Sequence, residues 1–330
     1  MNDQNKFIVI TSIFPPTRAV HDFARLEEWQ TIVVGDRKTV EPWRAEGVNF
    51  LSVAAQESSN YKIAKHLPWN HYCRKMIGYV EAIRSGAHII VDTDDDNLPK
   101  NDWAIPAFNG TFETTKEDAG FVNVYRAFTD NHIWARGFPL NLINEEKAIR
   151  DAQTTKKRTI EVGIWQGLAD GDPDVDAIYR LTNNQPCYFA DRDPLVLGRG
   201  TLSPFNSQNT AFRRELFSLL YLPSHVTFRF TDILRGLVAQ PLMWQAGYLL
   251  GFTKATVIQE RNPHDYLKDF ESEIPCYLYP EKIIEIVQTN SSAAKSIADN
   301  LHSAYEALAR NNIVPFEEMQ NLTAWLEDVA

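Results

Sequence analysis

The sequence predicts an α/β protein: a mostly parallel, doubly wound sheet flanked by helices, with a helical extension at the C-terminal end. Short apolar runs typical of buried strands alternate with helical patterns over residues 7–91. A cluster of aspartates directly follows one of these runs. Only amphipathic helical spacing remains beyond residue 279.

The N-terminal part is predicted to contain four strands and two helices. The first strand, at residues 7–14, is an apolar run that ends at Pro15-Pro16, as expected of a parallel strand buried on both faces. The other strands are expected at 31–34, 49–53 and 88–91, and the helices at 20–29 and 70–85. Gly86 is a suitable stop for the second helix.

The remaining chain divides into three parts. Residues 101–212 are rich in Gly, Pro, Asp and Asn, which predicts active-site loops and a few strands. A helix is expected at 232–248, and amphipathic helices at 281–310 and 316–329. We therefore expect a catalytic domain over residues 1–278 and a helical extension over 279–330.

Composition excludes several classes of protein. The net charge is −10 and no segment is dense in Lys or Arg, so neither general nucleic-acid binding nor binding to an anionic lipid surface is expected. The three cysteines are far apart, which argues against a zinc ribbon or a disulfide framework. No basic leader and no run of about 18 apolar residues is present, so a cytoplasmic protein without a membrane span is expected. The sequence leaves a homo-oligomer open.

The aspartate cluster is the first candidate site. Asp92, Asp94, Asp95 and Asp96 follow the strand at 88–91, and ligands in open α/β sheets bind outside the carboxyl ends of the strands. Mg²⁺ and Mn²⁺ prefer oxygen ligands and often bridge carboxylates to substrate phosphates. A solvated acidic loop or a helix cap is the alternative. The preceding strand and the following Leu98-Pro99 favour a metal and nucleotide site.

Two further candidates are ambiguous on sequence alone. Arg74 and Lys75, on the helix before the cluster, could reach a nucleotide or form an ordinary surface pair. Asp232, at the start of a predicted helix, could stabilise the helix N-terminus or remove a proton from an acceptor hydroxyl.

The Gly-interrupted aromatic segments at 134–139 and 163–168 could form a wall for a planar ligand or a packed corner. The scattered histidines lack ligand spacing and are expected to be structural or exposed.

Several segments, taken in order, carry a resemblance to a known family. They are CRKMIGYVEAIRSGAHIIVDTDDDNLP, VYRAFTDNHIWARGFPL, IWQGLADGDPDVDAIYRLT, LSPFNSQNTAF and LPSHVTFRFTDILRGLVAQPLMWQAGYLLGF. Over residues 7–275 the chain resembles the plant STELLO proteins and their bacterial and invertebrate relatives. More distantly, it is similar to the reversibly glycosylated polypeptides, the plant UDP-arabinopyranose mutases.

The resemblance implies a glycosyltransferase-A-type fold with a mixed sheet, a UDP-sugar donor and Mn²⁺ or Mg²⁺ as cofactor. It puts the family's Asp-x-Asp-Asp motif on Asp92, Asp94 and Asp95 as metal ligands, with Asp92 and Asp94 also on the nucleotide. The resemblance further implies roles for three other residues of this sequence. Arg74 matches the arginine that binds the nucleotide, Arg136 matches the arginine that carries the sugar in the mutases, and Asp232 matches a catalytic carboxylate.

Two departures from the family are visible. The relatives have a histidine just after the last core strand, whereas residues 257–259 contain none and His264 is the nearest; the membrane anchor of STELLO proteins is also missing from this sequence. The leading hypothesis is transfer of a sugar from a UDP-sugar to an unidentified glycan, lipid-linked sugar, protein or modified base. The alternatives are a UDP-pentose mutase acting through Arg136 and a non-catalytic scaffold that retains the fold.

Overall fold

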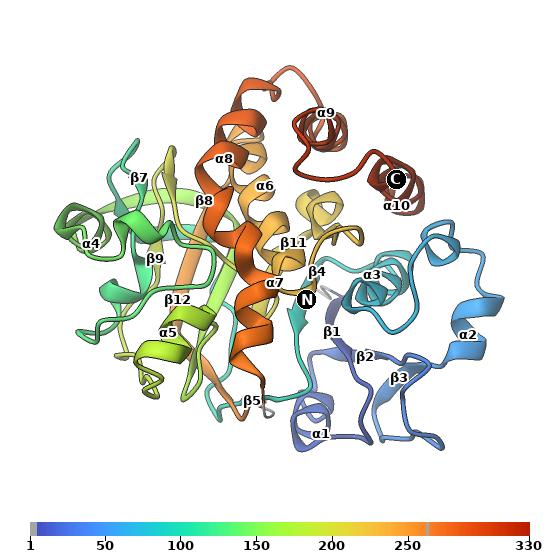
Figure 1. Ribbon diagram of the computed structural model, residues 1–330. Helices are drawn as coiled ribbons and strands as arrows, with labels where there is room; N and C mark the ends of the chain where they lie inside the picture. The colour runs from blue at the N-terminus through green and yellow to red at the C-terminus, as the bar shows by residue number, and fades with distance from the viewer. Residues whose placement is uncertain (1–4, 262–263) are drawn as a thin grey trace.

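The computed structural model describes residues 5–261 and 264–330 and contains a ten-stranded mixed sheet with helices on both faces (Figure 1). The strand order is β3-β2-β1-β4-β11-β8-β6-β9-β12-β5. The N-terminal strands are β1 (Lys6–Thr11), β2 (Gln30–Val34), β3 (Val48–Leu51) and β4 (Ile89–Thr93), which pair in parallel. These are the four strands that the sequence predicts, and the α/β fold class is confirmed.

The apolar run of β1 forms a strand because both of its faces are covered. Phe7 and Val9 belong to the larger hydrophobic core, on the side of helix α3 (Lys75–Arg84). Ile8 and Ile10 belong to a second core, on the side of helix α1 (Arg18–Ala24). Side chains alternate across a strand, so only an apolar residue at every position fills both cores.

Helix α3 lies close to the sheet because Gly78 faces it. A Cβ at this position would stand 2.5 Å from a methyl group of Val9 and 2.8 Å from one of Val34. The helix ends near Gly86, whose φ of +84° suits glycine. The predicted helix at 70–85 is in fact a 3₁₀ turn at Tyr72–Arg74 followed by α3, and the predicted helix at 20–29 is the shorter α1.

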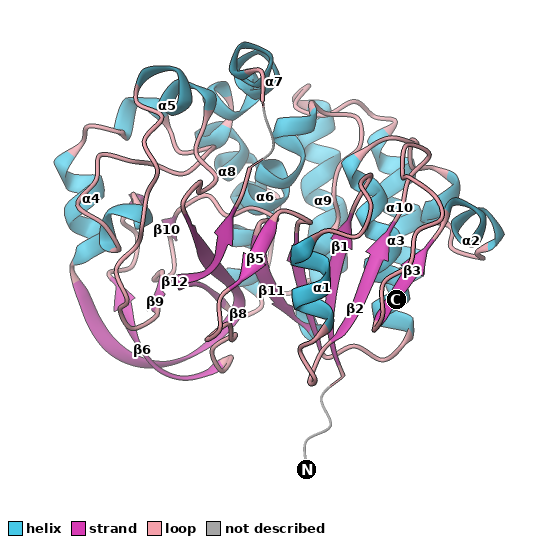
Figure 2. Cartoon of the chain, turned by 90° about the horizontal axis from the view of Figure 1, so that it is seen from below, coloured by secondary structure: helices cyan, strands magenta, loops and turns pink. Residues whose placement is uncertain are grey.

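The second half of the sheet is built around β8 (Thr155–Asp170), a long strand in the segment for which the sequence predicts active-site loops and a few strands. Its first part pairs with β6 (Asn109–Thr115), and its second part pairs in parallel with β12 (Leu249–Gln259). Strand β11 (Asn209–Arg213) joins the two halves by pairing antiparallel with both β4 and β8 (Figure 2).

The remaining elements are short. They are α2 (Val53–Ser58), β5 (Asn97–Pro99), β7 (Gly120–Phe121), α4 (Glu146–Gln153), α5 (Ala177–Thr182), β9 (Leu195–Val196), β10 (Thr201–Leu202) and 3₁₀ turns at Ile63–Lys65, Val124–Ala127, Leu140–Leu142, Arg214–Leu220 and Phe228–Phe230.

Helix α6 (Thr231–Gln245) is buried along nearly its whole length, in agreement with the helix expected at 232–248. It is followed, after β12, by α7 (Tyr266–Leu278), α8 (Pro280–Thr289), α9 (Ile297–Arg310) and α10 (Glu318–Val329). The single helix predicted at 281–310 is wrong: α8 and α9 are separate, and Ser296 caps α9 by accepting a hydrogen bond from the Asp299 amide.

The C-terminal helices share the larger core with the N-terminal half. Trp325 of α10 is fully buried, donates to the Ser218 carbonyl at 2.9 Å and packs near Tyr79 of α3. α8 and α9 pack on α6 (Figure 1). None of the helices among residues 5–261 and 264–330 is both long and apolar enough to cross a membrane.

Candidate nucleotide and acceptor site

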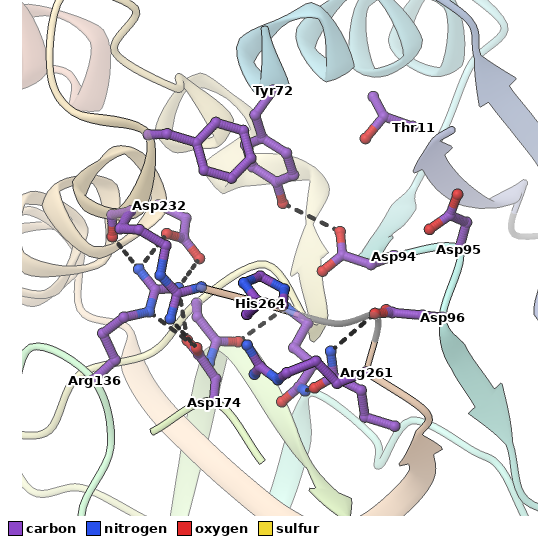
Figure 3. Close-up of a pocket in the computed structure, with 15 residues that line it drawn as sticks. Thr11, Tyr72, Asp94, Asp95, Asp96, Arg136, Asp174, Asp232, Arg261 and His264 are labelled. Carbon is purple, nitrogen blue, oxygen red and sulfur yellow. Dashed lines mark hydrogen bonds and ion pairs between the residues drawn. The ribbon is translucent and has the colours of Figure 1, made fainter. Parts of the chain in front are cut away.

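The acidic loop after β4 forms one wall of a cavity of about 240 Å³, here called the central pocket. The pocket opens at the carboxyl ends of β1 and β4, and its lining includes Asp94, Asp95 and Asp96 on one side (Figure 3). Arg136, Asp174 and Asp232 lie on the other side. Three of the four carboxylates in the aspartate cluster therefore line a cavity at the expected edge of the sheet.

A second cavity of about 310 Å³, here called the side pocket, adjoins the first. Thr11, Tyr72, Asp95 and Phe228 line both cavities. The other side-pocket residues come from the ends of β1 and β2 and from the start of α3. They are Ser12, Ile13, Phe14, Val34, Gly35, Asp36, Lys38, Asn70, His71 and Arg74.

The acidic loop is held at both of its ends. β4 is paired with β1 and β11, and β5, which follows the loop, is paired with β12. Within the loop, the Asp95 carbonyl accepts a hydrogen bond from the Thr17 hydroxyl at 2.6 Å, and the Asp96 carbonyl accepts one from the Glu260 amide at 3.1 Å. The carboxylates are thus fixed on a rigid turn between two strands.

Asp92 does not line either cavity. Its side chain is fully buried, with one oxygen 2.6 Å from the Lys75 ammonium and the other 2.7 Å from the Arg235 guanidinium. Burial alone would raise the pKa of Asp92, but these two cations outweigh it and lower the pKa. The Lys75 ammonium also lies 2.9 Å from Asp94 and 3.2 Å from the Tyr72 hydroxyl. Lys75 is thus a buried counter-ion, not a surface residue.

The three carboxyl groups that reach the pocket resist ionisation. Burial raises the pKa of Asp94 to about 6 against the attraction of Lys75, with repulsion from Asp96 and Asp92 adding to the effect of burial. Burial also raises the pKa of Asp95 and of Asp96, opposed by hydrogen bonds from Ser12 and Gln259 respectively. Clustered carboxylates of this kind are stabilised by a bound cation.

The donor set of the pocket fits a hard divalent cation. Asp94 is 31% exposed, and one Asp96 oxygen is buried without a hydrogen-bond partner among the described residues. The His264 imidazole lines the same pocket and lies 3.0 Å from Asp269. Carboxylate oxygens are ligands that suit Mn²⁺ or Mg²⁺. In the part of the chain that the structure describes, no three His, Cys, Asp or Glu side chains already form a metal cluster.

Arg136 is buried on the far side of the pocket and is completely hydrogen-bonded. Its five N–H groups donate to both oxygens of Asp174, at 2.9 and 2.7 Å, to both oxygens of Asp232, at 3.1 and 3.1 Å, and to the Arg229 carbonyl. Attraction from Asp174 and Asp232 outweighs burial and raises its pKa. The neighbouring Gly137 has a φ of +84°, and a Cβ there would meet Ile233 at 2.5 Å, so glycine lets this segment lie against α6.

Asp232 lies in the first turn of α6, as predicted, and accepts a third hydrogen bond from the Ser207 amide at 3.1 Å. Its partner Asp174 was not expected from the sequence. Burial would raise the pKa of Asp174, but Arg136 and Arg229 outweigh it and lower the pKa to about 2. Asp174 lies in the Asp-rich stretch GDPDVD, a pattern that turns and loops share.

Arg74 is buried beside the side pocket. It donates to the Gln56 side chain at 2.8 Å and to the Leu67 carbonyl at 3.1 Å, and its guanidinium stacks over Trp69. Its remaining terminal nitrogen has no hydrogen-bond partner among residues 5–261 and 264–330. An arginine with a spare donor at this edge fits the predicted nucleotide side of the site.

Of the two alternatives predicted for the Gly-interrupted aromatic segments, the structure does not show a wall for a planar ligand. Trp134 is buried and donates to Asp176 at 2.7 Å, and Trp165 lies in the second core. The pocket's aromatic residues are Tyr72 and Phe228. Phe228 is 56% exposed and packs edge-on against Tyr72, a role that no local sequence pattern indicated.

Comparisons with known proteins agree with the resemblance seen in the sequence. Residues 229–330 match the sequence model of the family described as STELLO glycosyltransferases. Two curated proteins of Arabidopsis thaliana, "Probable glycosyltransferase STELLO2" and "Probable glycosyltransferase STELLO1", are 28% and 27% identical to the chain. Each alignment covers 98% of this chain but 44% of the plant protein, so the chain spans less than half the length of these relatives. Over nearly its whole length the chain is therefore similar to the STELLO glycosyltransferases, and the part that the family model matches is residues 229–330.

Proposed function

We propose that the protein is a metal-dependent glycosyltransferase that moves a sugar from a UDP-sugar to an acceptor hydroxyl. The observation that carries this proposal is the position of Asp94, Asp95 and Asp96 in the wall of a pocket that adjoins a second, partly apolar pocket at the carboxyl ends of β1 and β2. The names of the two plant relatives support the reaction class.

The side pocket is the proposed site of the nucleoside. Ile13 and Phe14 are 41% and 43% exposed at this cavity, so they offer apolar surface to a base, and Arg74 offers a spare donor. Asp95 and Tyr72 line both cavities, so a diphosphate that links the nucleoside to the sugar would pass them. The sugar and the acceptor would then occupy the central pocket.

We propose that Asp94 and Asp96 hold the metal, with Asp95 and His264 as further candidates. Burial raises the Asp94 pKa to about 6, and a cation between Asp94 and Asp96 would relieve the repulsion from Asp96 that adds to this effect. The metal would supply electrostatic stabilisation of the departing diphosphate. Asp92 would instead fix the loop, because Lys75 and Arg235 occupy both of its oxygens.

Arg136 is better suited to positioning than to carrying the sugar. All five of its N–H groups are engaged, and its protonated form is strongly favoured, whereas a nucleophile needs a free lone pair. The geometry thus favours transfer over a mutase reaction through Arg136. We propose that Arg136 orients Asp232 and Asp174 towards the acceptor.

The test is the thermal stability of the purified protein against nucleotides and UDP-sugars, with and without Mn²⁺. A ligand that binds only the folded state raises stability once its concentration exceeds its dissociation constant, and a 100-fold excess corresponds to about 2.7 kcal/mol. We expect a rise that needs both UDP and Mn²⁺ and that is lost in Asp94→Asn. If neither UDP nor any other nucleotide stabilises the protein, the scaffold hypothesis replaces this proposal.

A further inference from the structure

Three arginines line the central pocket, and they differ in how their charges are balanced. Arg136 is paired with both Asp174 and Asp232. Arg229 lies 2.8 Å from Glu273 and 3.8 Å from Asp174. These two guanidinium groups therefore share three carboxylates, and neither needs an added anion.

Arg261, which follows β12, is held differently. Its Nε lies 2.8 Å from Asp172, and in the described part of the chain no other carboxylate is within ion-pair distance. Asp172 also pairs with Arg180, so two guanidinium groups share one carboxylate. Burial and repulsion from Arg261 together lower the pKa of Arg180. The Arg180–Asp172–Arg261 group thus carries one positive charge in excess.

Arg261 meets Asp172 at Nε, as an ion pair without a hydrogen bond, and its two terminal nitrogens remain for a ligand. Its side chain is only 7% exposed, yet it lines the central pocket, and Figure 3 shows its guanidinium inside the cavity, between Asp96 and Asp174. Among the described residues, its terminal nitrogens have no carboxylate within ion-pair distance. A buried guanidinium with two parallel donors and excess charge suits a phosphate oxyanion.

We infer that Arg261 binds the β-phosphate of a nucleoside diphosphate in the central pocket and stabilises it as the leaving group. This inference rests on the proposed function. When the bond between the sugar carbon and the β-phosphate oxygen breaks, its electron pair stays on that oxygen, and the acceptor oxygen takes the sugar carbon as it loses its proton to a base. The diphosphate gains one negative charge, which the Arg261 donors meet on the side of the pocket away from Asp94.

The experiment is calorimetric titration with UDP, UMP and inorganic pyrophosphate at saturating Mn²⁺. The variants are Arg261→Gln, Arg261→Lys and, as a matched control, Arg158→Gln at an exposed ion pair with Glu117. Loss of a charge-assisted hydrogen bond predicts that Arg261→Gln binds UDP and pyrophosphate about 10- to 100-fold more weakly. UMP affinity should change less than about threefold, Arg261→Lys should be intermediate, and the control should match the wild type.

Three outcomes would contradict the inference. Unchanged UDP affinity in Arg261→Gln, with the wild type binding UDP, overturns the role of Arg261 and leaves the proposed function standing. Equal losses for UMP and UDP place Arg261 elsewhere than at the β-phosphate. A wild-type protein that binds neither UDP nor pyrophosphate with Mn²⁺ overturns the proposed function as well. If Arg261→Gln does not fold, the comparison of Arg261→Lys with the wild type decides.

Discussion

At the scale of single residues, the aspartate cluster divides into a structural part and a pocket part. Asp92 is enclosed by Lys75 and Arg235, whereas Asp94 shares Lys75 but keeps part of its carboxylate exposed to the pocket. Removing one partner of a buried ion pair leaves an uncompensated charge and typically costs about 3–5 kcal/mol. The two positions should therefore respond to the same substitution in opposite ways.

We predict that Asp92→Asn lowers the free energy of unfolding by about 3 kcal/mol, because Arg235 loses its carboxylate partner. The Mn²⁺ affinity of the folded fraction should change less than about threefold, which denaturant unfolding and Mn²⁺ titration can measure together. Asp94→Asn should show the reverse, with the metal-dependent binding lost and the fold retained. An equal loss of Mn²⁺ affinity in both variants would make Asp92 a metal ligand after all.

The pair of Asp232 and Asp174 allows a test of the predicted general base. Both accept from Arg136, so either substitution disturbs the same guanidinium. If Asp232 removes the acceptor proton, Asp232→Asn should reduce kcat by about 10²- to 10⁴-fold with UDP affinity unchanged, and Asp174→Asn should cost much less. Equal losses in kcat would assign both residues to positioning Arg136, and surviving turnover in Asp232→Asn would place the base elsewhere.

At the scale of elements, the start of α10 is fastened to the loop that carries Phe228. Glu318 is fully buried and accepts hydrogen bonds from the Tyr221 hydroxyl, from the amides of Ser224 and His225, and from the His225 ring. A buried carboxylate with this many donors is costly to replace. The contact joins the C-terminal helices to the segment that precedes Phe228, which lines both pockets.

Glu318→Gln should lower the free energy of unfolding by about 2–3 kcal/mol, because an amide offers one acceptor oxygen where the carboxylate offers two. It should also weaken UDP binding a few-fold, since the loop that carries Phe228 is released. Glu317→Gln, at the exposed neighbouring position, is the matched control and should be neutral in both measurements. If Glu318→Gln is destabilised but binds UDP like the wild type, the contact at the start of α10 stabilises the fold without supporting UDP binding.

The elements differ in how far the sequence could predict them. The parallel strands were found because burial on both faces leaves an uninterrupted apolar run, as in β1. Strands were expected in residues 101–212, but the bounds of β8 could not be located. Its first half, with Lys156, Lys157 and Arg158, is exposed while its second half is buried, so no single hydrophobic period holds along it. The break between α8 and α9 is a short polar loop within a continuous amphipathic pattern, and only the cap at Ser296 marks it.

The aspartate cluster was predictable from a local signal, because it directly follows a buried strand. The helix start left the role of Asp232 open, and only the family resemblance implied a catalytic role for it. The pairing of Asp92 with Arg235 could not be predicted from the sequence, because Arg235 lies 143 positions away along the chain. The same holds for Arg261 and Asp172, whose pairing depends on the fold and on no spacing in the sequence.

At the scale of the whole molecule, the carboxyl groups make stability depend on pH. The folded-state pKa of Asp94 is about 6, above its ordinary value of 3.8, so the folded protein holds a proton that the unfolded chain has already released. Its contribution is fully present below pH 3.8 and is lost as pH rises through about 6. Asp176, with a pKa also raised to about 6 by burial, acts in the same direction. The lowered pKa of His71, caused by burial, acts in the opposite direction.

The difference between the wild type and Asp94→Asn isolates the first of these effects, because Asp176 and His71 are common to both proteins. Without metal, Asp94→Asn should be more stable than the wild type at pH 7 by about 1–2 kcal/mol, a value reduced from the full pKa shift because the side chain is partly exposed. The difference should shrink towards zero near pH 4–5, where Asp94 is protonated in the folded wild type.

Saturating Mn²⁺ at pH 7 should stabilise the wild type and leave the variant unchanged, so that the order of the two stabilities reverses. Denaturant unfolding of both proteins at pH 5 and pH 7, with and without Mn²⁺, measures the difference under all four conditions. If the difference in stability is the same at both pH values, the pKa of Asp94 is not raised in the folded protein. The electrostatic reason for placing a cation beside Asp94 would then be removed.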